Sequence, residues 1–95
     1  MRLEISDVAL GDLQDVYRYG VKVYGLAQAD AYMAGLRELL ALLTITPMMG
    51  RQRDEVRPPI RLVPYMAHHV FYDIIGDTVV IQRLLHRTAD WASGL

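Results

Sequence analysis

The 95-residue sequence predicts an α+β fold, in the order β-α-α-β-β-β, in which a helical hairpin packs on a small, mainly antiparallel sheet. Two observations support this fold class. Apolar residues recur at helical spacing through two consecutive segments before residue 47. After residue 60, apolar residues instead alternate with polar ones, which is the spacing of strands. We therefore expect a single domain that spans residues 1–95.

The N-terminal part predicts a short strand followed by the first helix. Residues 2–5 alternate apolar and polar side chains, and Ser6 stands at an N-cap position with Asp7 in the first helical turn. Gly20 lies within the apolar face, where it permits the close approach of a second helix, and Gly25 provides a stop signal. The apolar face of this helix consists of Ala9, Leu13, Val16, Gly20 and Val23.

The second helix follows after a very short connection, so the two helices must lie antiparallel. Its apolar stripe consists of Ala29, Tyr32, Met33, Leu36, Leu40 and Leu43. Pro47 ends the helix. Residues 48–59 contain Gly50, several charged residues and a Pro-Pro pair, and this composition predicts a surface loop.

Three strands are predicted after this loop, at residues 60–63, 67–75 and 78–86. Gly76 and Asp77 connect the last two strands, and glycine at the first position of a two-residue loop predicts a type II′ hairpin. Pro64 either breaks the first of these strands or places it at an edge of the sheet. The tail, residues 88–95, is expected to form a short helical turn or to be flexible.

Composition excludes several classes of protein. A chain with 53% hydrophobic and 22% charged residues is not a disordered polypeptide. It has no cysteine and therefore no disulfide framework, thiolate nucleophile or cysteine-based zinc site. No uncharged stretch reaches the roughly 18–20 apolar residues of a membrane-spanning helix, and no signal-peptide pattern is present. We expect a cytoplasmic protein without a membrane partner.

The charge pattern disfavours broad nucleic-acid binding, because the formal net charge is only −1. The most basic stretch contains Arg51, Arg53, Arg57 and Arg61, and a local arginine cluster aimed at one protein or phosphate site remains open. His68 and His69 are neighbours on a predicted strand, so their side chains leave opposite faces and cannot chelate one ion together. We expect no metal site and no cofactor.

Six side chains of the C-terminal half are candidates for a site on the sheet: Arg57, Arg61, Tyr72, Arg83, His86 and Arg87. Arginine, tyrosine and histidine that converge on one face could stabilise a scissile phosphate and move protons. They could equally anchor a partner protein, because tyrosine and arginine are preferred at interfaces. The third interpretation is structural, with solvated arginines and a half-buried tyrosine. These residues alone do not decide between the three.

An ordered set of motifs covers nearly the whole chain, from about Leu3 to Asp90. In chain order the set is Ala9-x-x-Asp12-Leu13-x-x-Val16-x-x-Tyr19, Gly25, Ala29-x-x-Tyr32 with the spaced leucines of the second helix, Pro47-x-x-Gly50, Arg61, Val70-Phe71-Tyr72-x-Ile74, and Val79-x-Ile81-x-Arg83-Leu84-Leu85-His86. The set resembles the RelE/ParE toxin superfamily of bacterial toxin–antitoxin modules, and within it the ParE branch. The fold of that family, a helical hairpin on a small antiparallel sheet, agrees with the fold predicted from the periodicity.

The resemblance implies the toxin of a type II toxin–antitoxin system, which forms a hetero-oligomer with a cognate ParD-like antitoxin. It also implies that DNA gyrase is the target and that the toxin traps the cleaved DNA complex without being a catalyst itself. On this interpretation the antitoxin-binding residues are Val8, Leu10, Tyr17 and Tyr24. The target-binding residues are Arg61, Arg83, His86, Arg87 and Trp91.

Two alternatives share the same fold. RelE-type relatives cleave messenger RNA on the ribosome, and that activity would here use Arg61, Tyr72, Arg83 and His86. The net charge of −1 disfavours such a nuclease, because the ribosome surrounds it with phosphates. The other alternative is an inactive toxin that is retained as an antitoxin-binding partner.

Overall fold

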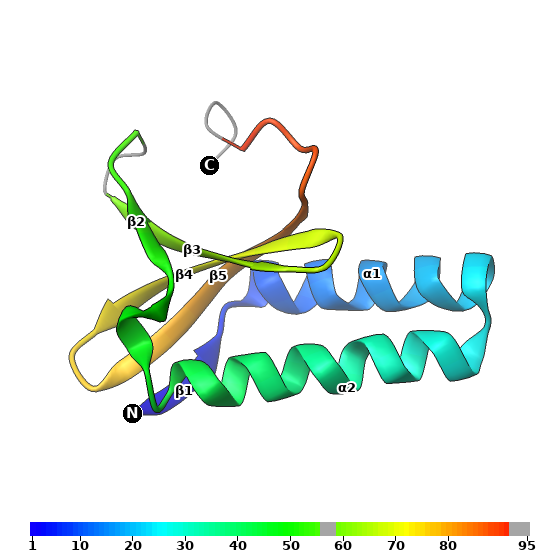
Figure 1. Ribbon diagram of the computed structural model, residues 1–95, viewed down its shortest axis with the longest axis horizontal. Helices are drawn as coiled ribbons and strands as arrows, with labels where there is room; N and C mark the ends of the chain where they lie inside the picture. Colours follow the sequence, from blue (N-terminus) through cyan, green and yellow to red (C-terminus); the bar gives the residue numbers. More distant parts are fainter. Residues whose placement is uncertain (56–58, 92–95) are drawn as a thin grey trace.

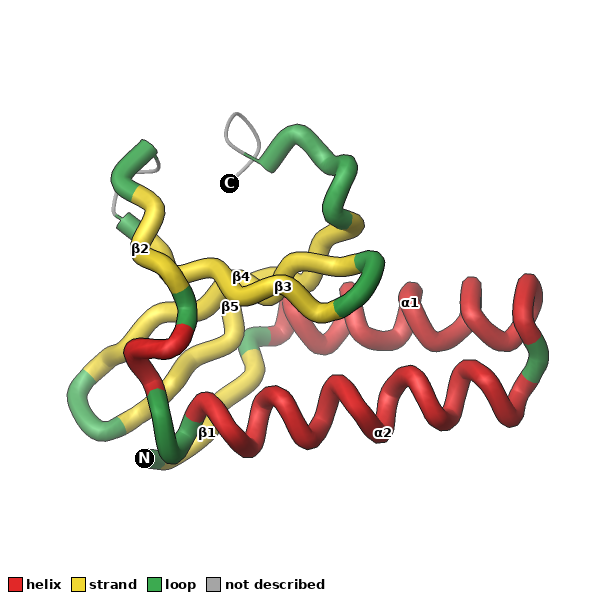
Figure 2. The backbone as a smooth tube through the Cα atoms, viewed as in Figure 1, coloured by secondary structure: helices red, strands yellow, loops and turns green. Residues whose placement is uncertain are grey.

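The computed structural model describes residues 1–55 and 59–91, and it has two layers, a helical hairpin and a five-stranded sheet (Figure 1). The elements are β1 (Arg2–Ile5), α1 (Asp7–Tyr24), α2 (Leu26–Leu43), the 3₁₀ turn η1 (Pro47–Met49), β2 (Arg51–Arg53), β3 (Ile60–Tyr65), β4 (His68–Ile75) and β5 (Thr78–His86). The two helices run antiparallel on the same side of the sheet (Figure 2). The predicted α+β architecture is confirmed.

The strands lie in the order β1-β5-β4-β3-β2. β1 pairs with β5 in parallel, and the other three pairings are antiparallel, so the sheet is mainly antiparallel as expected. Gly76 has a φ of 61° while Asp77 is not among the positive-φ residues, which is the backbone pattern of the predicted type II′ turn. A register shift lies between Phe71 and Tyr72 where β4 pairs with β5.

The structure corrects the prediction that residues 48–59 form only a loop. Arg51–Arg53 form strand β2, which pairs with β3, so four strands rather than three follow the hairpin. The short Arg-Gln-Arg sequence has no apolar alternation, and only its main-chain pairing with β3 makes it a strand. Strand β3 also continues through Pro64, at a point beyond its pairing with β2, where an imide without an N–H costs no hydrogen bond.

Local signals in the sequence set the ends of the helices. The Ser6 hydroxyl accepts a hydrogen bond from the Ala9 amide at 3.1 Å and caps α1. Gly25 has a φ of 92° and joins the two helices directly. A Cβ atom placed on Gly20 would lie 3.3 Å from the Ala29 Cβ, which confirms that this glycine lets the helices approach closely. Val23, predicted on the buried face, is 48% exposed because it lies near the tip of the hairpin.

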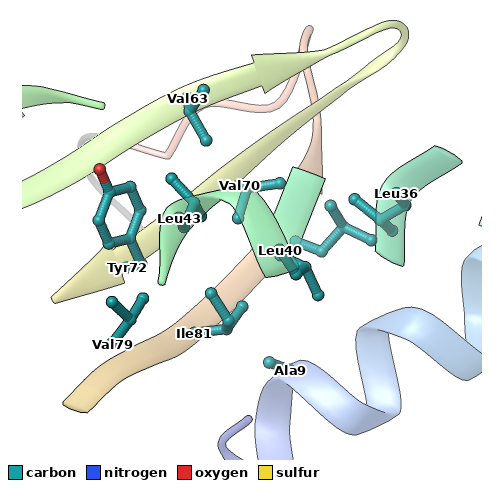
Figure 3. Packing of buried hydrophobic residues seen from close by; sticks show 10 residues of the cluster. Ala9, Leu36, Leu40, Leu43, Val63, Val70, Tyr72, Val79 and Ile81 are labelled. Carbon is teal, nitrogen blue, oxygen red and sulfur yellow. The ribbon is translucent and has the colours of Figure 1, made fainter. Parts of the chain in front are cut away.

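The core lies between the helices and the sheet (Figure 3). Its buried cluster contains Ala9, Leu36, Leu40, Leu43, Val63, Val70, Tyr72, Val79, Ile81 and Leu84. The apolar stripe predicted for the second helix supplies three of these side chains, Leu36, Leu40 and Leu43. The part of the hairpin next to β1 therefore packs on the sheet, and its tip projects beyond the sheet (Figure 1).

After β5, a turn follows in which the Ala89 amide donates to the His86 carbonyl at 2.9 Å. This turn lies in the tail, residues 88–95, for which the sequence predicts a short helical turn or a flexible segment. Residues 92–95 of that tail lie outside the described residues. No helix in the described ranges, 1–55 and 59–91, is long and apolar enough to cross a membrane.

Gly50 provides a test of the packing at the end of the core. A Cβ atom at this position would lie 2.5 Å from both Cε1 and Oη of the buried Tyr72. We expect Gly50→Ala to lower the free energy of unfolding by about 1–3 kcal/mol through overpacking. Chemical denaturation followed by circular dichroism measures this change.

Gly11→Ala is the matched control for this variant. No atom lies within 4 Å of the added Cβ, and Gly11 lies inside α1. Alanine should therefore stabilise the helix by up to about 1 kcal/mol. Equal stability changes in the two variants would contradict the packing described for Gly50.

Candidate functional site

A groove of about 450 Å³ lies between the outer half of the helical hairpin and the end of the sheet where β3 turns into β4. Aromatic and apolar side chains form most of its wall, and none of its lining residues is an Asp, Glu, Lys or Arg. The side chains that matter for its chemistry are Tyr17, Tyr19, Tyr24, Tyr32, Met33, Met66, His68 and His86. A concave surface of this composition is suited to an apolar or aromatic ligand segment.

Hydrogen bonds join α2 to the end of β3 and the start of β4, beside the groove. The Tyr32 hydroxyl lies 2.6 Å from the His68 Nδ1, and the Tyr65 hydroxyl donates to the Tyr32 carbonyl at 2.8 Å. The Tyr65 hydroxyl fits only because residue 35 is glycine, since a Cβ there would collide with it. These contacts attach α2 to the turn and hold the groove in shape.

Two histidines meet at one end of the groove. The His68 and His86 rings lie 5.6 Å apart in an edge-on arrangement, on neighbouring strands in direct register. Burial lowers the pKa of His68, and the nearby His86 and His69 lower it further. His68 is therefore more often neutral than a free histidine near neutral pH, which keeps charge out of the groove.

The predicted antitoxin-binding residues fall in two places. Tyr17 and Tyr24 line the groove. The Tyr17 hydroxyl donates to the Asp30 carboxylate at 2.7 Å, and this hydrogen bond raises the pKa of Tyr17. Val8 and Leu10 lie at the other end of α1, outside the groove, where Val8 is 57% exposed.

Tyr72, a candidate for proton transfer, is fully buried against the helices. Its hydroxyl donates to the Pro47 carbonyl at 2.6 Å and accepts from the Gly50 amide at 2.7 Å. The Arg61 guanidinium donates to the Gly50 carbonyl at 2.8 Å. Arg61 and Tyr72 thus lie next to one another, and both hold the chain at Gly50.

Arg83 forms an ion pair with Asp12 of α1, with Nε at 2.8 Å and Nη2 at 3.2 Å from the carboxylate oxygens. The same carboxylate accepts the Leu84 amide at 3.0 Å. The hydrogen bond that Arg83 donates to Asp12 raises the pKa of Arg83. In this structure the Arg83 side chain connects β5 to α1.

The remaining target-binding candidates are His86, Arg87 and Trp91. His86 is exposed at the groove, and its Nδ1 accepts the Thr88 amide at 3.2 Å. Arg87 is exposed just after β5, and Trp91 packs on Phe71. Arg57 lies outside the described residues. The six-residue set that the sequence suggested therefore does not form one open cluster among the described residues.

Sequence reasoning missed the contributions of Tyr32 and His68. Tyr32 was expected only as part of the apolar stripe of the second helix, and its hydroxyl contact with His68 joins residues 36 positions apart. The predicted separation of His68 and His69 is confirmed, because His68 contacts Tyr32 while His69 lies beside Phe71. Across residues 1–55 and 59–91, no group of three or more His, Cys, Asp or Glu is placed to hold a metal ion.

The fold and the groove define a class of structure, a small α+β domain with a helical hairpin on one face of a mixed sheet and an uncharged groove between the two layers. A family profile described as "ParE toxin of type II toxin-antitoxin system, parDE" matches residues 3–91. The chain therefore belongs to the ParE family of toxins of type II toxin–antitoxin systems. The resemblance inferred from the motifs is confirmed.

Individual relatives agree with this assignment. "Toxin ParE1" of Mycobacterium tuberculosis is 29% identical over 90 residues, which cover 94% of this chain and 92% of the relative. "Toxin ParE3" of Caulobacter vibrioides is 31% identical over 85 residues, which cover 90% of this chain and 85% of the relative. A solved structure described as "Chromosomal ParDE TA system from P. aeruginosa" matches 90% of this chain and 95% of its own, with a TM-score of 0.79 at 20% identity, and shares the fold.

His68, which lines the groove, should make the stability of the protein depend on pH. The folded pKa of His68 lies below the ordinary value of 6.5, so below about that pH the unfolded chain binds more protons than the folded one. The free energy of unfolding should therefore fall as the pH drops below about 6.5. Urea denaturation at pH 7.5 and at pH 5.5 measures this fall.

In the His68→Gln variant, the free energy of unfolding should fall less between pH 7.5 and pH 5.5, because glutamine does not titrate. Glutamine also keeps a polar partner for the Tyr32 hydroxyl. Part of the fall should remain, because burial and neighbouring cations also lower the pKa of His69. An equal fall in the variant and the parent protein would show that His68 does not contribute.

Proposed function

We propose that this ParE-type toxin inhibits DNA gyrase by trapping the cleaved DNA complex, and that a cognate ParD-like antitoxin neutralises it in a hetero-oligomer. The observation that carries the proposal is the family match over residues 3–91. The proposed target and antitoxin place the protein in the cytoplasm.

The groove supports an antitoxin partner. Most of its lining residues are aromatic or apolar and none is an Asp, Glu, Lys or Arg, and exposed hydrophobic side chains continue from it along the hairpin tip. Such a surface accommodates the apolar face of an amphipathic helix. A related solved structure is described as a ParDE toxin–antitoxin system, which agrees with a partner of this kind.

The geometry favours binding over ribonuclease catalysis. Of the four residues that a RelE-like activity would use, Tyr72 is 0% exposed and cannot reach a substrate in this conformation. The guanidinium of Arg83 is engaged by Asp12, and that of Arg61 by the Gly50 carbonyl. Only His86 is exposed, and one histidine does not supply both the acid and the base of such a reaction. We therefore propose that the toxin acts by binding.

A gyrase supercoiling and DNA-cleavage assay tests the proposed target. Purified toxin should inhibit supercoiling and accumulate cleaved DNA, and added antitoxin should reverse both effects. Cleavage of translated messenger RNA on ribosomes, without any effect on gyrase, would instead support the RelE-like alternative. Tight antitoxin binding with neither activity would support an inactive toxin.

Substitutions of two exposed hydrophobic residues test whether the groove is the antitoxin-binding site. Tyr24→Ser removes an aromatic side chain from the groove and should weaken antitoxin binding at least about tenfold, as expected for an aromatic anchor. Ile75→Ser is the control, because Ile75 is 58% exposed at the β4–β5 turn, far from the hairpin tip (Figure 1). Isothermal titration with the cognate antitoxin measures both affinities. Equal losses in both variants would exclude the groove as the antitoxin site.

A further inference from the structure

The face of the sheet that points away from the helices carries a second group of chemically active side chains. β2 and the segment after β5 both stand on this side of the sheet (Figure 1). Across it, the Arg53 guanidinium lies 5.3 Å from the centre of the Trp91 ring, and Trp91 in turn packs on Phe71 at 5.2 Å. The His69 ring lies 6.3 Å from Phe71.

Positive charge gathers around this aromatic group. Burial of the His69 ring, followed by the charges of Arg53 and Arg87, lowers the pKa of His69, so both arginines act on the same imidazole. Arg51 lies on the same face as Phe71, because each is a register partner of Leu62. Three arginines from two separate segments, β2 and the chain after β5, therefore face one region of the sheet.

The described neighbours neutralise this charge only in part. Glu55 accepts hydrogen bonds from Nε and Nη2 of Arg53, at 3.1 and 2.9 Å, and no bond within residues 1–55 and 59–91 uses Arg53 Nη1. The buried Nδ1 of His69 has no hydrogen-bond partner among the described residues. The guanidinium is thus held by Trp91 on one side and Glu55 on another, while donors remain for an anion.

We propose that Arg53 and Arg87, beside His69 and with Trp91 as the support of Arg53, form a binding site for the phosphodiester groups of a single nucleic-acid strand. Arg51 supplies a contact to a neighbouring phosphate along the strand. An extended strand fits better than a duplex, because the cationic side chains are few and localised while the chain as a whole carries a net charge of −1.

The site binds and does not cleave. Glu55, a carboxylate close to the site, is already paired with Arg53, and Tyr72 lies buried on the opposite face of the sheet. The inference goes beyond gyrase inhibition, because it assigns the toxin a nucleic-acid contact of its own, which can be tested without gyrase.

Trp91 is the only tryptophan of the chain, so its fluorescence reports directly on this site. Titration with ten-nucleotide oligo-dT and oligo-rU should change the emission of Trp91 in a saturable way, and inorganic phosphate at the same phosphate concentration should change it much less. Anisotropy of a labelled oligonucleotide gives the affinity independently. A preference for either oligonucleotide identifies the sugar that the site favours, and equal binding of both means recognition through phosphate.

Three glutamine variants separate this site from general electrostatic attraction. Arg53→Gln should weaken oligonucleotide binding at least about tenfold, since it removes a charge-assisted hydrogen bond. Glu55→Gln should strengthen binding, because it removes the competing carboxylate. Arg37→Gln is the matched control, since Arg37 is exposed on α2 and lies on the helical side of the molecule.

The salt dependence of oligonucleotide binding measures the number of phosphate contacts. With three phosphate contacts, the logarithm of the affinity should fall with the logarithm of the salt concentration at a slope of about −2, and Arg87→Gln should reduce this slope to about −1.4. Because Arg87 is exposed, Arg87→Gln still tests the site if Arg53→Gln disturbs the packing of Trp91.

Three results would overturn the proposal. The first is no oligonucleotide binding by protein that still binds its antitoxin. The second is an equal loss of affinity in Arg37→Gln and Arg87→Gln, and the third is inorganic phosphate binding as tightly as the oligonucleotides. Each result is independent of the gyrase assay, so failure of this site and failure of the proposed target are distinguishable.

Discussion

The carboxylate of Asp12 fixes the position of the helical hairpin on the sheet. β1 ends at Ile5 and pairs with β5 only as far as Ile81, so the outer edge of β5 has no strand partner beyond that point. Two side chains of the chain that leaves β1 complete this edge: the Ser6 hydroxyl donates to the Gln82 carbonyl, and Asp12 accepts the Leu84 amide together with the Arg83 guanidinium. Because these groups are partly buried, loss of the carboxylate would leave a cation and an amide without partners. The groove depends on this attachment, since its walls are the hairpin and the end of the sheet.

The alternation of a β-strand divides the chemistry of the protein between two faces. His68 and His69 are consecutive, yet His68 contacts Tyr32 in the groove while His69 lies beside Phe71 on the opposite face. Phe71 and Tyr72 divide in the same way, with Tyr72 in the core under the helices and Phe71 beneath Trp91. The consecutive polar and aromatic residues of β4 therefore belong to two separate surfaces. The helical face is uncharged at its groove, and the other face carries arginines.

The periodic parts of this fold could be predicted from the sequence, and the contacts of single side chains could not. Both helices, the last two strands and the Gly76 turn follow from patterns that lie within one segment. β2 escaped prediction because its three residues become a strand only through pairing with β3. The hydrogen-bond partners of the polar residues could not be predicted for a similar reason, because they lie far away in the sequence. The partner of Arg83 is 71 positions away, and that of the Tyr72 hydroxyl is 25 positions away. Arginine and tyrosine look the same in sequence whether they bind a ligand or hold the fold together.

The separation of the two faces has a consequence for how an antitoxin would neutralise the toxin. A partner confined to the groove would cover Tyr17, Tyr24 and His86, and it would leave Arg53 and Trp91 on the other side of the sheet open. The antitoxin would then block only the contact between the toxin and its protein target, because the proposed nucleic-acid contact would survive in the complex. An antitoxin that also abolished oligonucleotide binding would have to pass around the edge of the sheet. The edge formed by β2 is one such route, since β2 carries Arg51 and Arg53 and is the outermost of the described strands on that side. The comparison of oligonucleotide binding by free and antitoxin-bound toxin therefore reports how far the antitoxin extends.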